Sequence, residues 1–263
     1  MSKQIDSEGN AIRTFQISSN NPQGGIEVKI TEPNLTADNL PLETWASSWV
    51  MASQLHKLDI KMPSRTSATE LGTSNGDGVT ASDEPVAIIE LGAGTGLVGL
   101  TAAHEWNAPV ILTDLAPIVP GLQANISLNE RLLSSCSKAS ATCGTLDWND
   151  PTALTLSDGT TTISSRRKAT VLLAADTVYS EEHPELLEKV VVEWLARTPE
   201  ARFVITYAMR VAYLDEIRAV WERLENAGLV AVEEGQRRAG EGMFDDEGLC
   251  EWSVWKWKDL SSS

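Results

Sequence analysis

From residue 85 to the end of the chain, short apolar runs alternate with helix-length segments, and this alternation constrains the fold more than any other feature. Alternating strand and helix units predict a mostly parallel, doubly wound α/β sheet. No helix-length segment separates the last two runs, so we expect them to pair antiparallel at one edge. The expected strands lie at 86–91, 110–113, 141–146, 170–175, 202–207, 229–234 and 252–257. The expected helices lie at 97–106, 117–133, 181–197 and 213–227.

The part of the chain before residue 85 has a different character. Residues 14–18 and 26–30 alternate apolar with polar side chains on either side of a turn-rich stretch, which predicts a β-hairpin. Residues 42–55 carry an apolar stripe close to helical spacing. Residues 61–84 are rich in Ser, Thr, Gly and Asp and contain few apolar side chains that could be buried. This composition predicts a flexible insertion. We therefore expect one globular unit with an N-terminal hairpin and helix extension (1–60), an insertion (61–84) and a main domain (85–263).

Charge and cysteine content narrow the possible partners and compartments. The chain has 21 Lys and Arg against 37 Asp and Glu, a formal net charge of −16. That balance argues against nucleic acid and anionic membranes, and it suits a basic partner or simple solubility. No apolar run approaches the roughly 18 residues that a membrane helix needs. Three cysteines without CxxC spacing favour reduced thiols, and hence the cytoplasm or the nucleus.

A glycine-rich loop follows the first strand of the main domain. Residues 90–96 are Glu-Leu-Gly-Ala-Gly-Thr-Gly, between an apolar run and a helix. Glycines let the backbone turn tightly near a ligand, and the helix N-terminus offers unpaired N–H groups. Asp114 ends the next strand, 22 positions after Gly92. A carboxylate there can accept both hydroxyls of a ribose, so the pattern predicts a nucleoside-type cofactor at the carboxyl ends of the strands.

Two details favour S-adenosylmethionine over NAD. Leu97 occupies the position where GxGxxG requires its third glycine. Glu90 stands two positions before the first glycine, where an acid in methyltransferases commonly orders the loop and the methionine amino group. A tight turn that binds no ligand is the alternative.

Several segments, taken together, resemble the motifs of the seven-strand protein-lysine methyltransferases. That family includes enzymes that act on translation elongation factors, Hsp70 chaperones and valosin-containing protein. The resemblance implies a Rossmann-like, seven-stranded sheet and S-adenosylmethionine as the cofactor. Its hallmark is an acid followed three positions later by an aromatic residue, here Asp176 and Tyr179. The resembling segments are 44–52, 89–99, 112–115, 125–129, 146–148 and 174–179.

The resemblance also implies roles for individual residues. Gly92, Ala93 and Gly94 would line the methionine part of the cofactor, and Asp114 would hold the ribose. Trp148 would pack on the adenine, Ala175 would offer backbone contacts, and Trp45 would close the cofactor site. Asp176 and Tyr179 would orient the acceptor nitrogen. The alternatives are core packing for the two tryptophans and a helix cap for Asp176. No metal site is expected, because the three histidines lack ligand spacing.

The acceptor expected from these features is a lysine side chain on a basic protein, such as a translation elongation factor. Asp176-Thr177-Val178-Tyr179 lacks the adjacent prolines typical of enzymes that methylate nucleic-acid bases. Ala46, Ser48 and Trp49 depart from the family's pattern, which leaves the exact substrate open. Two other functions remain as alternatives: methylation of a small molecule, and a non-catalytic module that binds S-adenosylmethionine.

Overall fold

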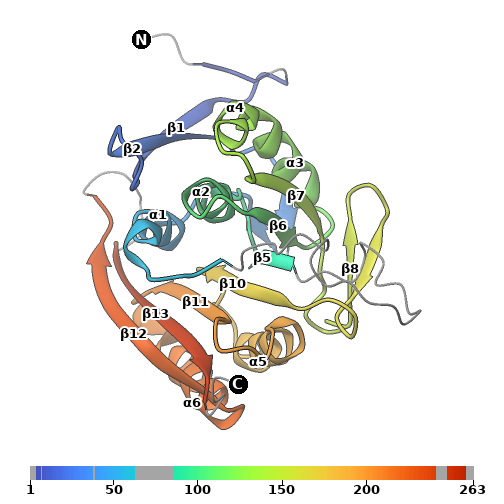
Figure 1. Cartoon of the computed structure of the whole chain (residues 1–263), viewed down its shortest axis with the longest axis vertical. Coiled ribbons are helices and arrows are strands. Elements are labelled where there is room, and N and C mark those ends of the chain that lie inside the picture. Colours follow the sequence, from blue (N-terminus) through green and yellow to red (C-terminus); the bar gives the residue numbers. More distant parts are fainter. Residues whose placement is uncertain (1–3, 7, 38, 63–85, 241–247, 259–263) are drawn as a thin grey trace, which may run out of the picture.

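The computed structural model describes residues 4–6, 8–37, 39–62, 86–240 and 248–258. Its centre is a nine-stranded sheet with the order β12-β13-β11-β10-β5-β6-β7-β8-β9 (Figure 1). Strands β7, β6, β5, β10 and β11 are parallel, and β13 lies antiparallel between β11 and β12. The strands of this sheet are β5 (Val86–Leu91), β6 (Pro109–Asp114), β7 (Ser140–Thr145), β8 (Ala153–Leu156), β9 (Thr161–Ile163), β10 (Ala169–Ala175), β11 (Arg202–Ala208), β12 (Leu229–Arg238) and β13 (Leu249–Trp257).

Helices cover both faces of this sheet (Figure 1). One buried cluster joins the sheet to α2 and the N-terminal hairpin, and the other joins it to α5 and α6. Because both faces are covered, the central strands are mostly apolar, and all seven residues of β10 are buried. The helices are α1 (Ala46–Ala52), η1 (Leu55–Lys57), α2 (Leu97–Glu105), α3 (Val119–Leu128), α4 (Glu130–Ser134), α5 (His183–Trp194), η3 (Val211–Tyr213) and α6 (Leu214–Asn226).

The N-terminal hairpin packs on the side of the sheet that α2 covers, and a buried amide links it to the main domain. The hairpin pairs β1 (Ile12–Ser18) with β2 (Gly25–Thr31), and a shorter pair joins β3 (Thr36–Ala37) to β4 (Leu40–Pro41). The fully buried Asn125 of α3 accepts hydrogen bonds from the backbone N–H and the hydroxyl of Thr31. Its amide donates to the carbonyls of Thr31 and Thr95. One side chain therefore holds together the hairpin and the glycine loop.

The predicted α/β sheet, the antiparallel C-terminal pair and the N-terminal hairpin are confirmed, with one addition. No strand was expected between residues 146 and 170, but this segment contains β8 and β9, so the sheet has nine strands where seven were expected. These strands are short, and most of their residues are not buried. Gly159 follows Asp158 with a φ of +86°, and this Asp-Gly turn is the hairpin signal in an otherwise polar stretch.

Two expected helices differ from the structure in extent. The helix expected at 117–133 breaks at Asn129, between α3 and α4. The side chain of Asn129 accepts a hydrogen bond from the N–H of Lys29 and donates one to the carbonyl of Lys29. It therefore bonds the backbone of β2 at the point where the helix is interrupted. The helix expected at 42–55 is only α1, followed by η1.

Three further expectations concern the insertion, membrane-spanning helices and a metal site. Apart from Lys61 and Met62, the predicted insertion at 61–84 lies outside the described residues. Within the described ranges, no helix is long and apolar enough to cross a membrane. The same ranges contain no group of three or more His, Cys, Asp or Glu placed to hold a metal ion.

Candidate functional site

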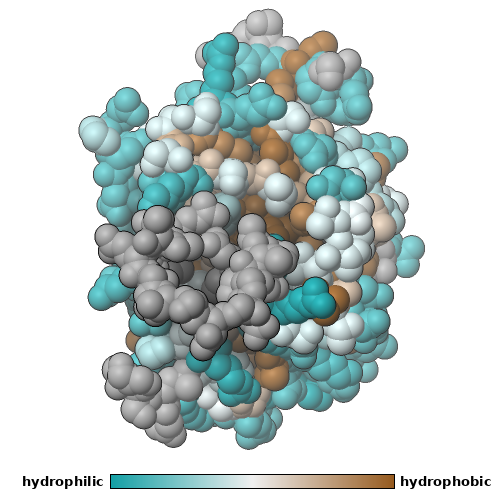
Figure 2. Space-filling model, turned by 45° about the vertical axis from the view of Figure 1, so that its right-hand side comes forward, coloured by the Kyte–Doolittle hydropathy of each residue, from teal (hydrophilic) through white to brown (hydrophobic). Residues whose placement is uncertain are grey.

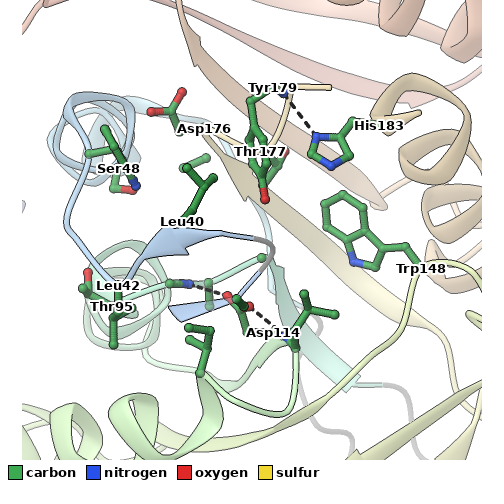
Figure 3. Close-up of a pocket in the computed structure, with 18 of the residues that line it drawn as sticks. Leu40, Leu42, Ser48, Thr95, Asp114, Trp148, Asp176, Thr177, Tyr179 and His183 are labelled. Carbon is green, nitrogen blue, oxygen red and sulfur yellow. Dashed lines mark hydrogen bonds between the residues drawn. The ribbon is translucent and has the colours of Figure 1, made fainter. Parts of the chain in front are cut away.

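A cavity opens where β5, β6 and β10 end, and the segment before α1 forms its opposite wall (Figure 3). The carboxyl ends of parallel strands are where open α/β sheets bind ligands. Asp114 and Trp148 lie at one side of the cavity and Asp176 lies at the other, beside Ser48. The residues that line the cavity include Leu40, Leu42, Glu43, Trp45, Ser48, Gly92, Ala93, Gly94, Thr95, Asp114, Leu115, Ile118, Leu146, Asp147, Trp148, Ala175, Asp176, Thr177, Tyr179 and His183.

The glycine loop requires glycine for both conformation and space. Gly92, Gly94 and Gly96 have φ angles of +58°, +54° and +80°, which side chains rarely adopt. A Cβ at Gly92 would lie 3.0 Å from the methyl group of Thr177, and one at Gly96 would lie 2.9 Å from Leu112. The bare backbone of Gly92 and Gly94 therefore forms the cavity floor.

Glu90 lies beneath this loop and not in the cavity lining. Its side chain is buried, and its Oε2 accepts a hydrogen bond of 2.8 Å from the N–H of Gly99, in the first turn of α2. Burial raises the pKa of Glu90 to about 8, with the charge of Asp114 adding to the effect and the Gly99 hydrogen bond opposing it. Glu90 thus fixes α2 against the sheet, while its expected contact with a methionine amino group stays a prediction.

Asp114 ends β6 and holds the glycine loop through backbone hydrogen bonds. Its Oδ2 accepts from the N–H of Gly94 at 2.7 Å, and its Oδ1 accepts from the N–H of Leu115 at 2.7 Å. Each carboxylate oxygen can accept more than one hydrogen bond. The carboxylate therefore retains the capacity to accept the two hydroxyls of a ribose.

Beside Asp114, the cavity wall is flat and apolar. Trp148 is half-buried and lines this part together with Leu115, Ile118 and Leu146. The ring of His183 lies edge-on to Trp148, with ring centroids 6.2 Å apart. An aromatic surface next to a carboxylate fits an adenosine group, because the ring stacks on the base and the acid accepts from the sugar.

Asp176 follows β10 in an uncommon backbone conformation and forms an ion pair. Its φ is +60°, in the left-handed region that Asp and Asn tolerate better than most residues. Its two carboxylate oxygens accept from the two guanidinium nitrogens of Arg210, at 2.8 and 2.9 Å. The side chain of Asp176 is only 4% exposed. The carboxylate therefore does not cap α5, which was the alternative to a functional role.

Tyr179 is held by a neighbour in the same wall. Its backbone N–H donates to Nδ1 of His183 at 3.2 Å, and the two rings meet edge-on with centroids 4.2 Å apart (Figure 3). A neutral imidazole that accepts at Nδ1 carries its proton on Nε2. His183 therefore joins Trp148 on one side to Tyr179 on the other.

The structure brings nine of the ten predicted site residues into one cavity lining: Trp45, Gly92, Ala93, Gly94, Asp114, Trp148, Ala175, Asp176 and Tyr179. Glu90 is the exception. Trp45 precedes α1, and the guanidinium of Arg210 lies 5.6 Å from the centre of its ring. All three cysteines are thiols.

Sequence reasoning missed two neighbours of these residues. Arg210 lies just past the end of β11, the strand beside β10. The only sequence signal for this neighbour was a cationic residue that follows an expected strand. His183 falls within the helix expected at 181–197, and its spacing of four positions from Tyr179 was its only signal.

The chain matches the lysine methyltransferase family over residues 26–219. It is 33% identical over 227 residues to protein-lysine N-methyltransferase EFM2 of Saccharomyces cerevisiae, covering 83% of this chain and 48% of that protein. It is 27% identical over 251 residues to protein-lysine N-methyltransferase rrg1 of Schizosaccharomyces pombe, covering 93% of this chain and 70% of that protein. The chain therefore spans about half the length of the first of these relatives.

A solved structure with a similar fold is magnesium protoporphyrin IX methyltransferase of Synechocystis PCC 6803. It is 16% identical, with a TM-score of 0.46, over 66% of this chain and 71% of that one. The family match covers the glycine loop, Asp114 and the hallmark Asp176 to Tyr179. By that match, the chain belongs to the lysine methyltransferase family.

Proposed function

We propose that this protein transfers a methyl group from S-adenosylmethionine to a lysine side chain of another protein. One observation carries the proposal: an Asp114–Trp148 wall suited to adenosine and an Asp176–Tyr179 wall share a single cavity. The first wall would hold the cofactor. The second would receive the acceptor amine, as the family resemblance implies.

The cofactor wall fits S-adenosylmethionine in shape and chemistry. Gly92, Ala93 and Gly94 would line its methionine part, Asp114 would accept from its ribose and Trp148 would stack on its adenine. When bound, the cofactor supplies a methyl group on a sulfonium. Thr95 shares a 3.0 Å hydroxyl hydrogen bond with Thr44, which fixes the N-terminal segment over the same loop.

The lysine that reaches the acceptor wall must lose a proton before it can react. A free lysine has a pKa of about 10.4 and arrives as an ammonium. Transfer requires the lone pair, so the proton must leave to water before the nitrogen reacts. Asp176 and Tyr179 would orient the nitrogen by hydrogen bonding, and the apolar lining would desolvate it, which favours the neutral amine.

The surface suits a basic partner. Hydrophilic residues cover much of the face shown in Figure 2, and the chain has a net charge of −16. An acidic surface attracts a lysine-rich segment at long range. We propose that the acceptor is a basic protein such as a translation elongation factor, and that the protein acts in the cytoplasm or the nucleus. Its thiol cysteines support these compartments.

The test uses an extract of Saccharomyces cerevisiae cells that lack EFM2, because a related acceptor there would be unmodified. Purified protein and tritium-labelled S-adenosylmethionine are added, and the extract is resolved by gel. We expect one or few labelled protein bands, and none with the Asp114→Ala variant. Label only in small molecules would favour the small-molecule alternative. Cofactor binding with no transfer to any fraction would favour a non-catalytic module.

A further inference from the structure

The methionine part of S-adenosylmethionine carries an ammonium group, and a carboxylate is the strongest hydrogen-bond partner for such a cation. The family resemblance implies Glu90 for this role. In the structure, Glu90 lies beneath the glycine loop, where its Oε2 accepts from the N–H of Gly99, and it is not part of the cavity lining. Burial also raises the pKa of Glu90 to about 8, so its side chain is mostly uncharged at neutral pH. Glu90 is therefore poorly placed to bind a cation in the cavity.

Four acids of the described chain do line the cavity, and three of them already accept hydrogen bonds. These three are Asp114, Asp147 and Asp176. The fourth is Glu43, which is exposed and has no hydrogen bond or ion pair to its carboxylate within the described ranges. Of the four, Glu43 is thus the acid whose full acceptor capacity is open to a ligand.

We propose that Glu43, in place of Glu90, is the cofactor-binding residue whose carboxylate receives the ammonium of the methionine part. The inference rests on the proposed function, in which Gly92, Ala93 and Gly94 line that part of the cofactor. The carbonyl oxygen of Glu43 lies 4.0 Å from the position that a Cβ at Gly94 would occupy. The segment that carries Glu43 therefore lies directly over the glycines that would line the methionine part.

Both neighbours of Glu43 hold its backbone in this place. Leu42 is 4% exposed, and its side chain lies against Gly121 of α3. Thr44 is 5% exposed, and its hydroxyl shares a hydrogen bond of 3.0 Å with the hydroxyl of Thr95, in the glycine loop. Because the residues before and after it are anchored, Glu43 keeps a fixed backbone position while its side chain stays exposed. Such an acceptor loses little freedom when a ligand binds.

The test measures affinity by calorimetry for two ligands. One is the demethylated cofactor, S-adenosylhomocysteine, and the other is its deaminated analogue, which lacks the ammonium and keeps the carboxylate. Glu43→Gln keeps the shape of the side chain and removes its charge. It should weaken binding of the demethylated cofactor about three- to tenfold, because it removes a partly exposed, charge-assisted contact. Binding of the deaminated analogue should stay the same or become tighter, since its carboxylate no longer meets an acid.

Asp147→Asn is the matched control. It also removes one exposed acid from the cavity lining, beside Trp148 at the adenine end. The two ligands are identical at that end, so this variant should change both affinities by the same factor. Glu90→Gln tests the role that the resemblance implies, and it should leave the ratio of the two affinities unchanged. Binding of the deaminated analogue also shows that the site of each variant is intact.

Equal losses for both ligands in Glu43→Gln, or no loss for either, would overturn the inference and leave the proposed function standing. A change of the ratio in Glu90→Gln and not in Glu43→Gln would overturn it too, and would return the role to Glu90. A wild-type protein that binds neither ligand would overturn the cofactor site of the proposed function, and the inference with it.

Discussion

Asp114 and Asp176 lie at the ends of β6 and β10, the two strands that flank β5 in one sheet, and the donors that bond their carboxylates differ in charge. Asp114 is bonded by the backbone N–H groups of Gly94 and Leu115, which are neutral. Asp176 is bonded by the guanidinium of Arg210, which is charged. Both kinds of donor orient a carboxylate, and the guanidinium forms charge-assisted hydrogen bonds. In the proposed function, Asp114 would accept ribose hydroxyls and Asp176 would orient an amine.

The largest effect that would test this comparison is expected from Asp114→Ala. The substitution removes the acceptor for the ribose and releases the N–H of Gly94 in the cavity floor. Each charge-assisted hydrogen bond is worth about 1.5 to 3 kcal/mol, so affinity for the demethylated cofactor should fall at least about a hundredfold by calorimetry. Asp147→Ala, which removes an exposed acid from the same lining, should stay within a few-fold. Equal losses in both variants would contradict a specific role for Asp114.

A smaller effect is expected from Asp176→Asn, and it should appear in the transfer rate and not in the affinity for the cofactor. Asparagine tolerates the positive φ and keeps the shape, so the change removes mainly the charge. The transfer rate should drop about ten- to a hundredfold, because one charge-assisted hydrogen bond is lost. Affinity for the cofactor should stay within a few-fold. A variant that lost cofactor affinity instead would show that the division between the two walls is mistaken.

Glu90 provides a third acid, whose effect should appear in stability. Its pKa is about 8 in the folded chain and near 4.5 when unfolded. Between these values the folded chain binds a proton that the unfolded chain has released, so the free energy of unfolding falls as pH rises through this window. Denaturant melts of wild type and Glu90→Gln should diverge between pH 5 and 8 by on the order of 2 to 4 kcal/mol, the variant gaining. A flat difference would mean that Glu90 is not held in a raised-pKa site.

The smallest effect is expected from the predicted insertion. The predicted insertion at 61–84 holds few apolar residues, too few to offset the entropy of ordering it. Replacing it with a short Gly/Ser linker should leave the melting temperature within a few degrees. Collapse of soluble expression would show that the segment packs.

The sequence was sufficient to predict the sheet and most of the cavity because these features are local. The glycine-rich loop after an apolar run locates Gly92 at the end of one strand, and Asp114 directly follows the next expected strand. The contact between two residues far apart in the sequence was missed. Arg210 stands 34 positions after Asp176, and the pairing of β10 with β11 brings the two residues together. Glu90 shows the same limit. It shares the strand parity of Ile88, which packs in the cluster with α2, so its side chain points to α2 and away from the cavity.

The most direct test of the central claim is the chemical identity of the labelled residue. Labelled proteins from the EFM2-deficient extract are hydrolysed to amino acids, and the tritium is separated by chromatography against methylated standards. The proposed function predicts that the label elutes with methylated lysine, and that Asp176→Asn lowers this peak while cofactor binding persists. Label in methylated arginine or histidine, or in no amino acid at all, would contradict the account.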